Sequence, residues 1–181
     1  MVWLDDPPKE LTQGCIIDGV DWGMGDSNPL SIIITNACDF EHDKCSFINV
    51  LALEPAKEVL QATKEFRGLI QNVADPHVLS KKQTKSIEDY FKKIIYNQNI
   101  IRYYFFDTNP VIDLGLVVAD FQQVKSILPD DEIKCIGKLK SPFIEQLLMH
   151  YASYVSRVPS DRVEDNQLND YIKELADPYT V

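Results

Sequence analysis

The residues most suggestive of chemistry lie between positions 38 and 45, where two cysteines flank a histidine. Cys38, His42 and Cys45 have the spacing Cys-x3-His-x2-Cys in a loop that we expect to connect two strands. Thiolate and imidazole are good zinc ligands, so a zinc ion is one interpretation of this spacing. A closed structural site needs a fourth ligand, which Cys15 would supply if its strand lies nearby. The alternative is structural, with small buried thiols at strand ends and a solvated histidine.

Carboxylates and cations suggest acid–base or electrostatic chemistry at two further places. Asp120 lies inside the apolar run Val-Val-Ala-Asp-Phe, where a buried charge needs a partner such as an arginine. We favour a structural ion pair there, with a catalytic carboxylate as the alternative. Asp39 is expected to accept hydrogen bonds from the loop backbone in an Asx-turn, with the Cys38 thiol packed beneath the hairpin. The catalytic candidates are two acids and two cations: Asp39, Asp120, Lys44 and Arg102.

One predicted helix gathers five lysines, namely Lys81, Lys82, Lys85, Lys92 and Lys93. They lie mostly opposite the apolar stripe of the helix, which is typical of an ordinary solvated face. With Arg102, Tyr103 and Tyr104 close behind in the sequence, they are also candidates for phosphate binding and base stacking. A formal net charge of −10 weighs against nucleic-acid binding by the whole surface, because charges of the same sign repel.

The common catalytic and nucleotide-binding motifs are missing. The sequence has no Gly-x-Ser-x-Gly elbow, and its seven glycines form neither Gly-x-Gly-x-x-Gly nor a Walker loop, so we expect no cofactor. Its four cysteines are not spaced as a disulfide framework. No stretch approaches the roughly 18 apolar residues that cross a bilayer, and the start lacks the features of a signal peptide. We therefore expect a cytoplasmic protein with no membrane association.

The elements that must position these residues follow from hydrophobic periodicity. Runs of strand type occur at 15–18, 31–35, 46–53, 100–106, 115–121 and 132–139. Apolar residues at spacings of three and four predict amphipathic helices at 56–70, 80–95 and 143–158. Ser80 and Gln83 form a capping box for the second helix, and Ser141-Pro142 supplies a cap and a first-turn proline for the third. A last, acidic helix is predicted from about residue 160 to 175.

This order predicts an α+β fold, with a small bent antiparallel sheet or SH3-like barrel assembled from both ends of the chain. We expect residues 1–159 to form one domain that includes a helical insertion at about 54–98 and a helix covering an end or a face of the sheet. Residues 160–181 would form an acidic C-terminal helical appendage. A length of 181 residues agrees with one domain and an appendage.

Several short motifs resemble an uncharacterised group of bacterial and phage proteins. They are Gly14-Cys15-Ile16-Ile17, Ile33 to Phe40 with Lys44 after it, Arg102 to Phe105, Val118 to Gln122, and Leu139 to Phe143 with Arg157-Val158. In that group a Gly-Asp-Ile start precedes a Thr-x-x-Cys-Asp-Ile strand end, and a Val-Asp-Phe segment precedes a Ser-Pro-Phe-x-Glu helix. Cys15 departs from the group, in which aspartate is usual at this position.

The resemblance implies a bent barrel similar to the SH3-like fold of the MazF and PemK toxins, in proteins often encoded among anti-phage defence genes. It implies no established activity. The positions that match the group's motifs are Cys38, Asp39, Lys44 and Asp120. We therefore expect a non-enzymatic interaction or accessory module of a bacterial multi-protein system, with a protein partner and amphipathic helices for contact. The alternative is a MazF-like endoribonuclease or another nucleic-acid-directed enzyme, so the sequence leaves open whether the protein is an enzyme.

Overall fold

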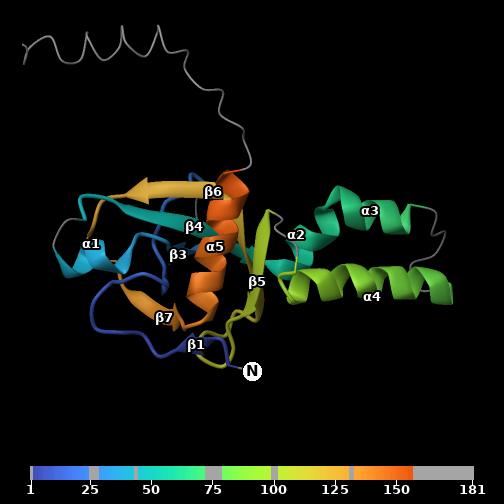
Figure 1. The fold of residues 1–181 in the computed structure, drawn as a ribbon, viewed down its shortest axis with the longest axis horizontal. Helices are drawn as coiled ribbons and strands as arrows, with labels where there is room; N and C mark the ends of the chain where they lie inside the picture. Colours follow the sequence, from blue (N-terminus) through green and yellow to red (C-terminus); the bar gives the residue numbers. More distant parts are fainter. Residues whose placement is uncertain are drawn as a thin grey trace, which may run out of the picture.

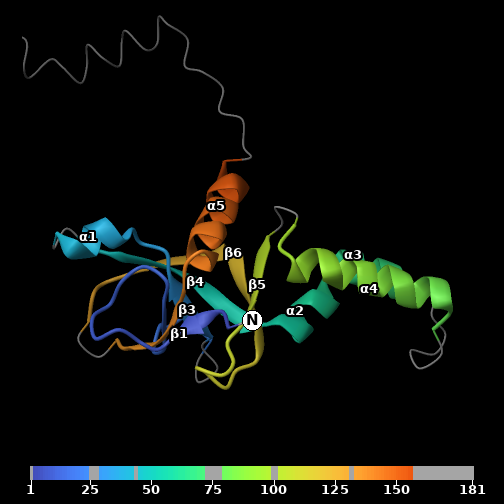
Figure 2. The same cartoon turned by 60° about the horizontal axis from the view of Figure 1, so that its bottom comes forward.

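The computed structural model describes residues 2–24, 29–42, 45–71, 79–98, 102–130 and 133–156. Its strands are β1 (Leu4–Asp5), β2 (Cys15–Ile17), β3 (Leu30–Ile33), β4 (Ile48–Pro55), β5 (Tyr103–Asp107), β6 (Leu116–Ile127) and β7 (Cys135–Leu139). They form one antiparallel sheet in the order β1-β7-β2-β3-β4-β6-β5, so strands from both ends of the chain are neighbours. The sheet is strongly curled (Figure 2), which confirms the predicted α+β class with a bent antiparallel sheet.

The helices are α1 (Ala37–Glu41), α2 (Ala56–Ala62), α3 (Lys64–Ile70), α4 (Lys81–Ile95) and α5 (Phe143–Val155). The predicted insertion is present, because α2, α3 and α4 lie between β4 and β5 in the chain and extend together from one end of the sheet (Figure 1). We call these three helices the helical extension. Figure 1 places α1 at the opposite end. Among the described residues, no helix is both long and apolar enough to cross a bilayer.

Side chains of successive strand residues point to opposite faces of the sheet, and the buried apolar residues form three cores. In β6, Ala119 and Phe121 join a core that α5 covers with Ile144 and Leu147. Val118 faces the other way, into a small core beneath α2 and α4. Asp120, two residues after Val118, therefore lies on the sheet face that carries the helical extension. The residues on either side of it in the strand, Ala119 and Phe121, point into the opposite core.

Local hydrogen bonds explain where the helices begin. The predicted capping box is confirmed, since the Gln83 N–H donates to Ser80 Oγ at 3.3 Å and the Ser80 N–H donates to Gln83 Oε1 at 3.0 Å. The single helix predicted over 56–70 is wrong, because Thr63 is extended (φ −64°, ψ 150°) and divides it into α2 and α3. The Thr63 hydroxyl accepts from the Phe66 N–H, so threonine caps the second helix rather than continuing the first.

The segment expected to be a hairpin loop contains a short helix instead. Asn36, not Asp39, supplies the side-chain acceptor, because Asn36 Oδ1 accepts from the Cys38 N–H at 3.3 Å and caps α1. The prediction that Cys38 packs beneath the hairpin is wrong, since Cys38 is exposed. Ser141 was expected to cap α5, but Pro142 occupies the cap position and makes no side-chain capping bond. The predicted acidic helix after residue 159 lies outside the described residues.

Asn97 fixes the end of α4 against the edge strand β5. Its amide oxygen accepts from the Phe105 N–H at 2.8 Å, and its amide nitrogen donates to the Phe105 carbonyl at 2.9 Å. The side chain thus satisfies the backbone groups that a further strand would pair, which protects this part of the edge. Asn97 adopts a φ of 47°, a conformation that asparagine tolerates better than most residues. The helical extension is therefore tied to the sheet at this point.

Candidate functional site

A β-bulge in β6 arranges polar groups where the sheet meets the helical extension. Leu51 of β4 lies opposite Val124, but the next residue, Ala52, lies opposite Asp120. Residues 121–123 therefore have no counterpart on β4, and the Phe121 N–H instead donates to the Arg102 carbonyl at 2.9 Å. Bulges of this kind change the direction in which side chains point and are common beside functional sites.

Asp120 forms a buried ion pair with Arg102, as the structural interpretation of the sequence predicts. Arg102 Nε donates to Asp120 Oδ1 at 2.7 Å and Nη2 donates to Oδ2 at 2.5 Å. The Gln122 N–H and the Gln123 side-chain amide also donate to this carboxylate, at 3.0 and 3.4 Å. Asp120 is completely buried, whereas the Arg102 side chain is 39% exposed. The carboxylate beside it raises the pKa of Arg102, which stays charged. With four donors on a buried carboxylate, Asp120 is placed to hold the bulge rather than to exchange protons.

Glu54 lies beside this pair and is linked to it through Gln123, whose amide nitrogen donates to Glu54 Oε1 as well as to Asp120. Burial and the negative charge of Asp120 raise the pKa of Glu54, against the opposing effects of the Gln123 hydrogen bond and Arg102. Glu54 also faces an open cavity of about 440 Å³ that Glu58 and Tyr103 help to line. Of the two linked carboxyl groups, Glu54 is therefore the one with access to solvent.

Glu54→Gln should make the protein more stable at about pH 7. A raised carboxyl pKa means that the folded state disfavours the charged form, so the stability associated with Glu54 is complete below its unfolded pKa and falls as pH rises through its folded pKa. The amide oxygen of glutamine can still accept from Gln123. Urea unfolding should show an advantage for the variant near pH 7 that shrinks near about pH 4. Glu58→Gln, on the same cavity, is the control; a less stable Glu54→Gln protein at pH 7 would contradict the prediction.

Arg102 and Tyr103 separate two cavities. The guanidinium carbon of Arg102 lies 5.1 Å from the centre of the Tyr103 ring. On one side is the cavity that Glu54 faces, and on the other is a cavity of about 360 Å³ between α3, α4 and β5. Tyr90 lines this second cavity, and its hydroxyl lies 2.8 Å from Thr63 Oγ1. Burial raises the pKa of both Tyr90 and Tyr103, so both hydroxyls remain protonated at neutral pH.

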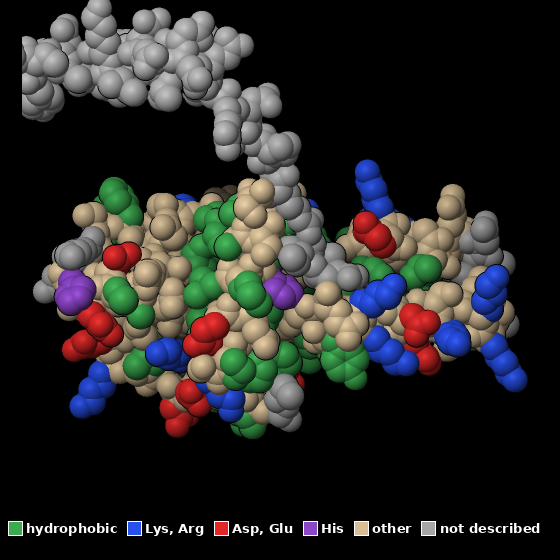
Figure 3. Space-filling view, viewed as in Figure 1, with side chains coloured by type: hydrophobic (Ala, Val, Ile, Leu, Met, Phe, Trp, Pro, Cys, Tyr) green, Lys and Arg blue, Asp and Glu red, His purple; other side chains and the backbone are tan. Residues whose placement is uncertain are grey.

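An apolar groove of about 560 Å³ lies further along β5, between the end of α4 and the start of α5. The exposed fractions of Ile95, Tyr96 and Leu116 are 42%, 67% and 53%, which are high for large apolar side chains. Trp3 and Phe143 form the opposite wall, with ring centres 4.3 Å apart. Figure 3 shows hydrophobic side chains gathered where the sheet meets the end of α4. We call this feature the apolar groove.

The five candidate lysines lie on α4 and are exposed, but they do not form a purely basic surface. Lys81, Lys85 and Lys92 share a groove with the acidic residues Glu88 and Asp89. Figure 3 shows basic and acidic side chains next to one another along the helical extension. Lys82 is exposed on the same helix, and Lys93 lines the cavity beside Arg102.

Tyr104 is completely buried and donates its hydroxyl to the Phe143 carbonyl at 3.2 Å. It cannot serve as the stacking platform that the sequence suggested. Of the predicted pair of aromatic platforms, only Tyr103 keeps partial exposure.

The structure does not gather the proposed zinc ligands. Cys38 and His42 are exposed on and after α1, and Cys45 Sγ lies 3.1 Å from the Phe47 carbonyl, to which it donates. In the described parts of the chain, no three His, Cys, Asp or Glu side chains lie close enough together to hold a metal ion. Burial, together with the charge of Asp39, raises the pKa of Cys45, which favours the thiol over the thiolate. The proposed fourth ligand, Cys15, is buried in β2.

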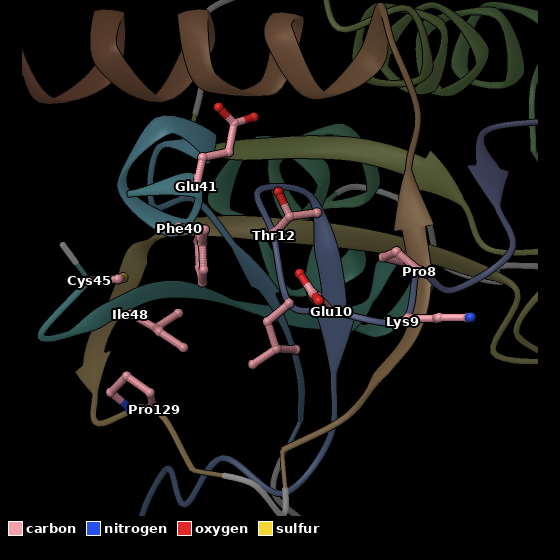
Figure 4. A pocket seen from close by; sticks show the side chains of 10 residues that line it. Pro8, Lys9, Glu10, Thr12, Phe40, Glu41, Cys45, Ile48 and Pro129 are labelled. Carbon is pink, nitrogen blue, oxygen red and sulfur yellow. The ribbon is translucent and has the colours of Figure 1, made fainter. Parts of the chain in front are cut away.

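Cys45 lines a wide cavity of about 650 Å³ next to α1 (Figure 4). Phe40, Cys45 and Ile48 lie along one side of it, while the side chains of Lys9 and Glu41 point away from them. Polar groups do not converge in this cavity, so its size alone does not make it the candidate site.

The catalytic candidates are likewise separated. Asp39 lies on α1, at the end of the sheet opposite the helical extension beside which Arg102 and Asp120 pair (Figure 1). Lys44 lies outside the described residues. Arg102 and Asp120 are therefore brought together as an ion pair, and Asp39 is not part of the same site.

Comparison with protein-family models and with curated proteins finds no match to this chain. Sequence reasoning missed Glu54 and Gln123, which the bulge brings to Asp120, and it missed the apolar groove. Glu54 had one available signal, because it interrupts the apolar run at residues 50–53 and precedes a proline. No sequence pattern marks the bulge.

Proposed function

We propose that the protein is a non-catalytic binding module of a multi-protein assembly and that a partner protein docks in the apolar groove. The observation that carries this proposal is the convergence of Ile95, Tyr96 and Leu116, all exposed, on one concave surface. Apolar surface that gathers in this way is typical of protein–protein contacts, and buried tyrosines often dominate their binding energy. The resemblance to proteins encoded among anti-phage defence genes suggests a bacterial defence system as the setting.

The polar groups around Asp120 favour a structural role over catalysis. A general acid or base needs a free proton or lone pair within reach of a substrate. The Asp120 carboxylate already accepts from three residues and has no exposed surface. Glu54 is accessible, but its linked neighbours are a carboxylate that is already paired with Arg102 and an amide. These groups hold the bulge in β6, and nothing in their arrangement requires a reacting substrate.

A protein partner fits the groove better than nucleic acid does. Its walls come from Trp3, Tyr96 and Phe143, and the charged residue that lines it is Asp107, an acid. Aromatic side chains are enriched in the centres of protein interfaces, whereas nucleic-acid affinity depends on cations that meet phosphates. The net charge of −10 also disfavours nucleic acid, because like charges repel.

Co-expression with the genes that neighbour its own tests the proposal. Size-exclusion chromatography with light scattering should show the chain in a complex with a different protein, at a mass above the 20.7 kDa of the single chain. Elution as a solitary 20.7 kDa species together with measurable turnover of a substrate would contradict it. Loss of RNA integrity on induction of the protein alone would favour the endoribonuclease alternative.

A further inference from the structure

We infer that the cavity between α3, α4 and β5 is a second binding site, which takes a small aromatic anion and holds its anionic group at the Arg102 guanidinium. The volume of about 360 Å³ falls among those of small-molecule sites, which span roughly 300–1,000 Å³. Tyr90, Ile94 and Tyr103 give it apolar walls suited to a planar ring. This site lies at the start of β5, whereas the apolar groove lies further along the same strand, and the inference does not depend on the proposed function.

Arg102 keeps donors for a second acceptor. A guanidinium carries five N–H bonds, and Asp120 takes one from Nε and one from Nη2 along the side of the group. The two Nη1 hydrogens and the second Nη2 hydrogen have no acceptor among the described residues. Together they can bind a planar carboxylate, or two oxygens of a phosphate, at the end of the guanidinium while Asp120 remains bound.

Asp120 also fixes the position of the Arg102 guanidinium before any ligand binds. Asp120 has no exposed surface and is itself held by Gln122 and Gln123, whereas the Arg102 side chain is 39% exposed. Tyr103 lies beneath the guanidinium at 5.1 Å. Little side-chain entropy remains to be lost on binding, which improves the affinity of a site of this size.

The charges around Arg102 place the anion on this side rather than in the neighbouring cavity. Glu54 and Glu58 line the neighbouring cavity and would repel an anion. The cavity between α3, α4 and β5 contains Lys93 and a single acid, Glu65. Glu65 lies in the first turn of α3, where the positive end of the helix dipole offsets part of its charge. Lys93 is exposed and can turn toward a bound anion.

A matched pair of ligands tests the inference. The probes are 1-naphthoate, an aromatic carboxylate, and 1-naphthalenemethanol, which keeps the ring but has no charge. Each is titrated into the full chain by calorimetry, with ¹H–¹⁵N spectra recorded in parallel. We expect saturable binding of one naphthoate per chain with a Kd below about 1 mM and binding of the alcohol about fivefold weaker. The largest amide shifts should occur at Ile94 and Tyr103.

Single substitutions locate the site without disturbing the ion pair. Lys93→Ala should weaken naphthoate binding about threefold, because it removes an exposed charge near the anion. Lys92→Ala removes the neighbouring lysine, which lines a different groove, and should leave the affinity unchanged. Tyr103→Leu keeps the wall apolar but removes the ring, and should weaken naphthoate binding about fivefold. Cooperative thermal unfolding of this variant checks that it remains folded.

Three results would overturn the inference: no saturable binding of naphthoate, equal affinity for the two ligands, or amide shifts centred on Tyr96 and Leu116. The last result would assign the naphthoate to the apolar groove. None of these outcomes bears on whether a protein partner docks in that groove, so the two proposals fail separately.

Discussion

Arg102→Met should lower the free energy of unfolding by about 3 kcal/mol, because it leaves the Asp120 carboxylate buried without a cation. The methionine side chain fills a similar volume, so the loss reports the charge rather than a cavity. Adding Asp120→Asn should recover about 1 to 2 kcal/mol, since the amide oxygen still accepts from the Gln122 N–H but carries no charge. Urea unfolding of the two variants measures both effects.

Lys93→Met is the control for Arg102→Met, because it removes an exposed cation that faces the same cavity. It should change the stability by no more than about 0.5 kcal/mol. If Arg102→Met were equally mild, the ion pair would not be what holds the bulge, and the structural role assigned to Asp120 would be wrong.

Gly14→Ala should also lower the free energy of unfolding by about 3 kcal/mol, because an alanine there would have both an unfavourable backbone conformation and a steric clash. Gly14 has a φ of +85°, and a Cβ added there would meet the Leu139 carbonyl oxygen at 3.0 Å and Ile144 Cγ1 at 3.3 Å. The same residue joins two strands, since its N–H donates to the Ile33 carbonyl and its carbonyl accepts from the Leu139 N–H, both at 2.9 Å. A shift of the backbone that moved the new Cβ away from Leu139 would therefore disturb these hydrogen bonds between the strands.

Gly19→Ala isolates the conformational part of this effect. Gly19 has a similar φ of +82°, but no atom lies within 4 Å of the position that a Cβ would take. Gly19→Ala should lower the free energy of unfolding by about 1 kcal/mol, as measured by thermal or urea unfolding. Equal losses at the two glycines would show that the close approach of Leu139 does not contribute.

The ion pair and Asn97 hold the elements that form the two proposed binding surfaces beside α4. Arg102 and Asp120 hold the start of β5 to the bulge in β6, and Asn97 ties the end of α4 to Phe105 further along β5. The end of α4 is thus attached to the sheet at Phe105, on a strand whose start is itself held by the ion pair. The cavity beside Arg102 and the apolar groove lie on either side of this attachment.

Hydrophobic periodicity was enough to predict the α+β class and the helical insertion, and the spacing of Ser80 and Gln83 predicted the capping box of α4, because each depends on the local sequence. Periodicity failed to predict the helix boundaries where a polar side chain accepts a hydrogen bond from a backbone N–H group. Thr63 divides a continuous apolar stripe into two helices, and Asn36 begins a helix in an expected loop. β1 was not predicted, since two residues carry no period and its pairing with β7 is a long-range contact.

The candidate site could be predicted only in part. A lone aspartate in an apolar strand indicated an ion pair with an arginine, and the structure contains one between Asp120 and Arg102. The bulge that adds Glu54 and Gln123 depends on the register between β4 and β6, which is set by long-range pairing. The amphipathic helices were expected to be available for partner contact, but periodicity does not show which residues stay exposed; Ile95 of α4 lines the apolar groove and is 42% exposed.

The most direct test of the binding-module proposal is the affinity of the co-purified partner for a chain with an altered groove. Tyr96→Ser combined with Leu116→Ser removes two exposed apolar side chains from the apolar groove. Met149→Ser, which removes a similarly exposed side chain of α5 that does not line the groove, is the matched control. Titration calorimetry should show a partner Kd at least about tenfold weaker for the double variant and unchanged for the control. Equal affinity of the partner for the wild-type chain and the double variant would contradict the proposal.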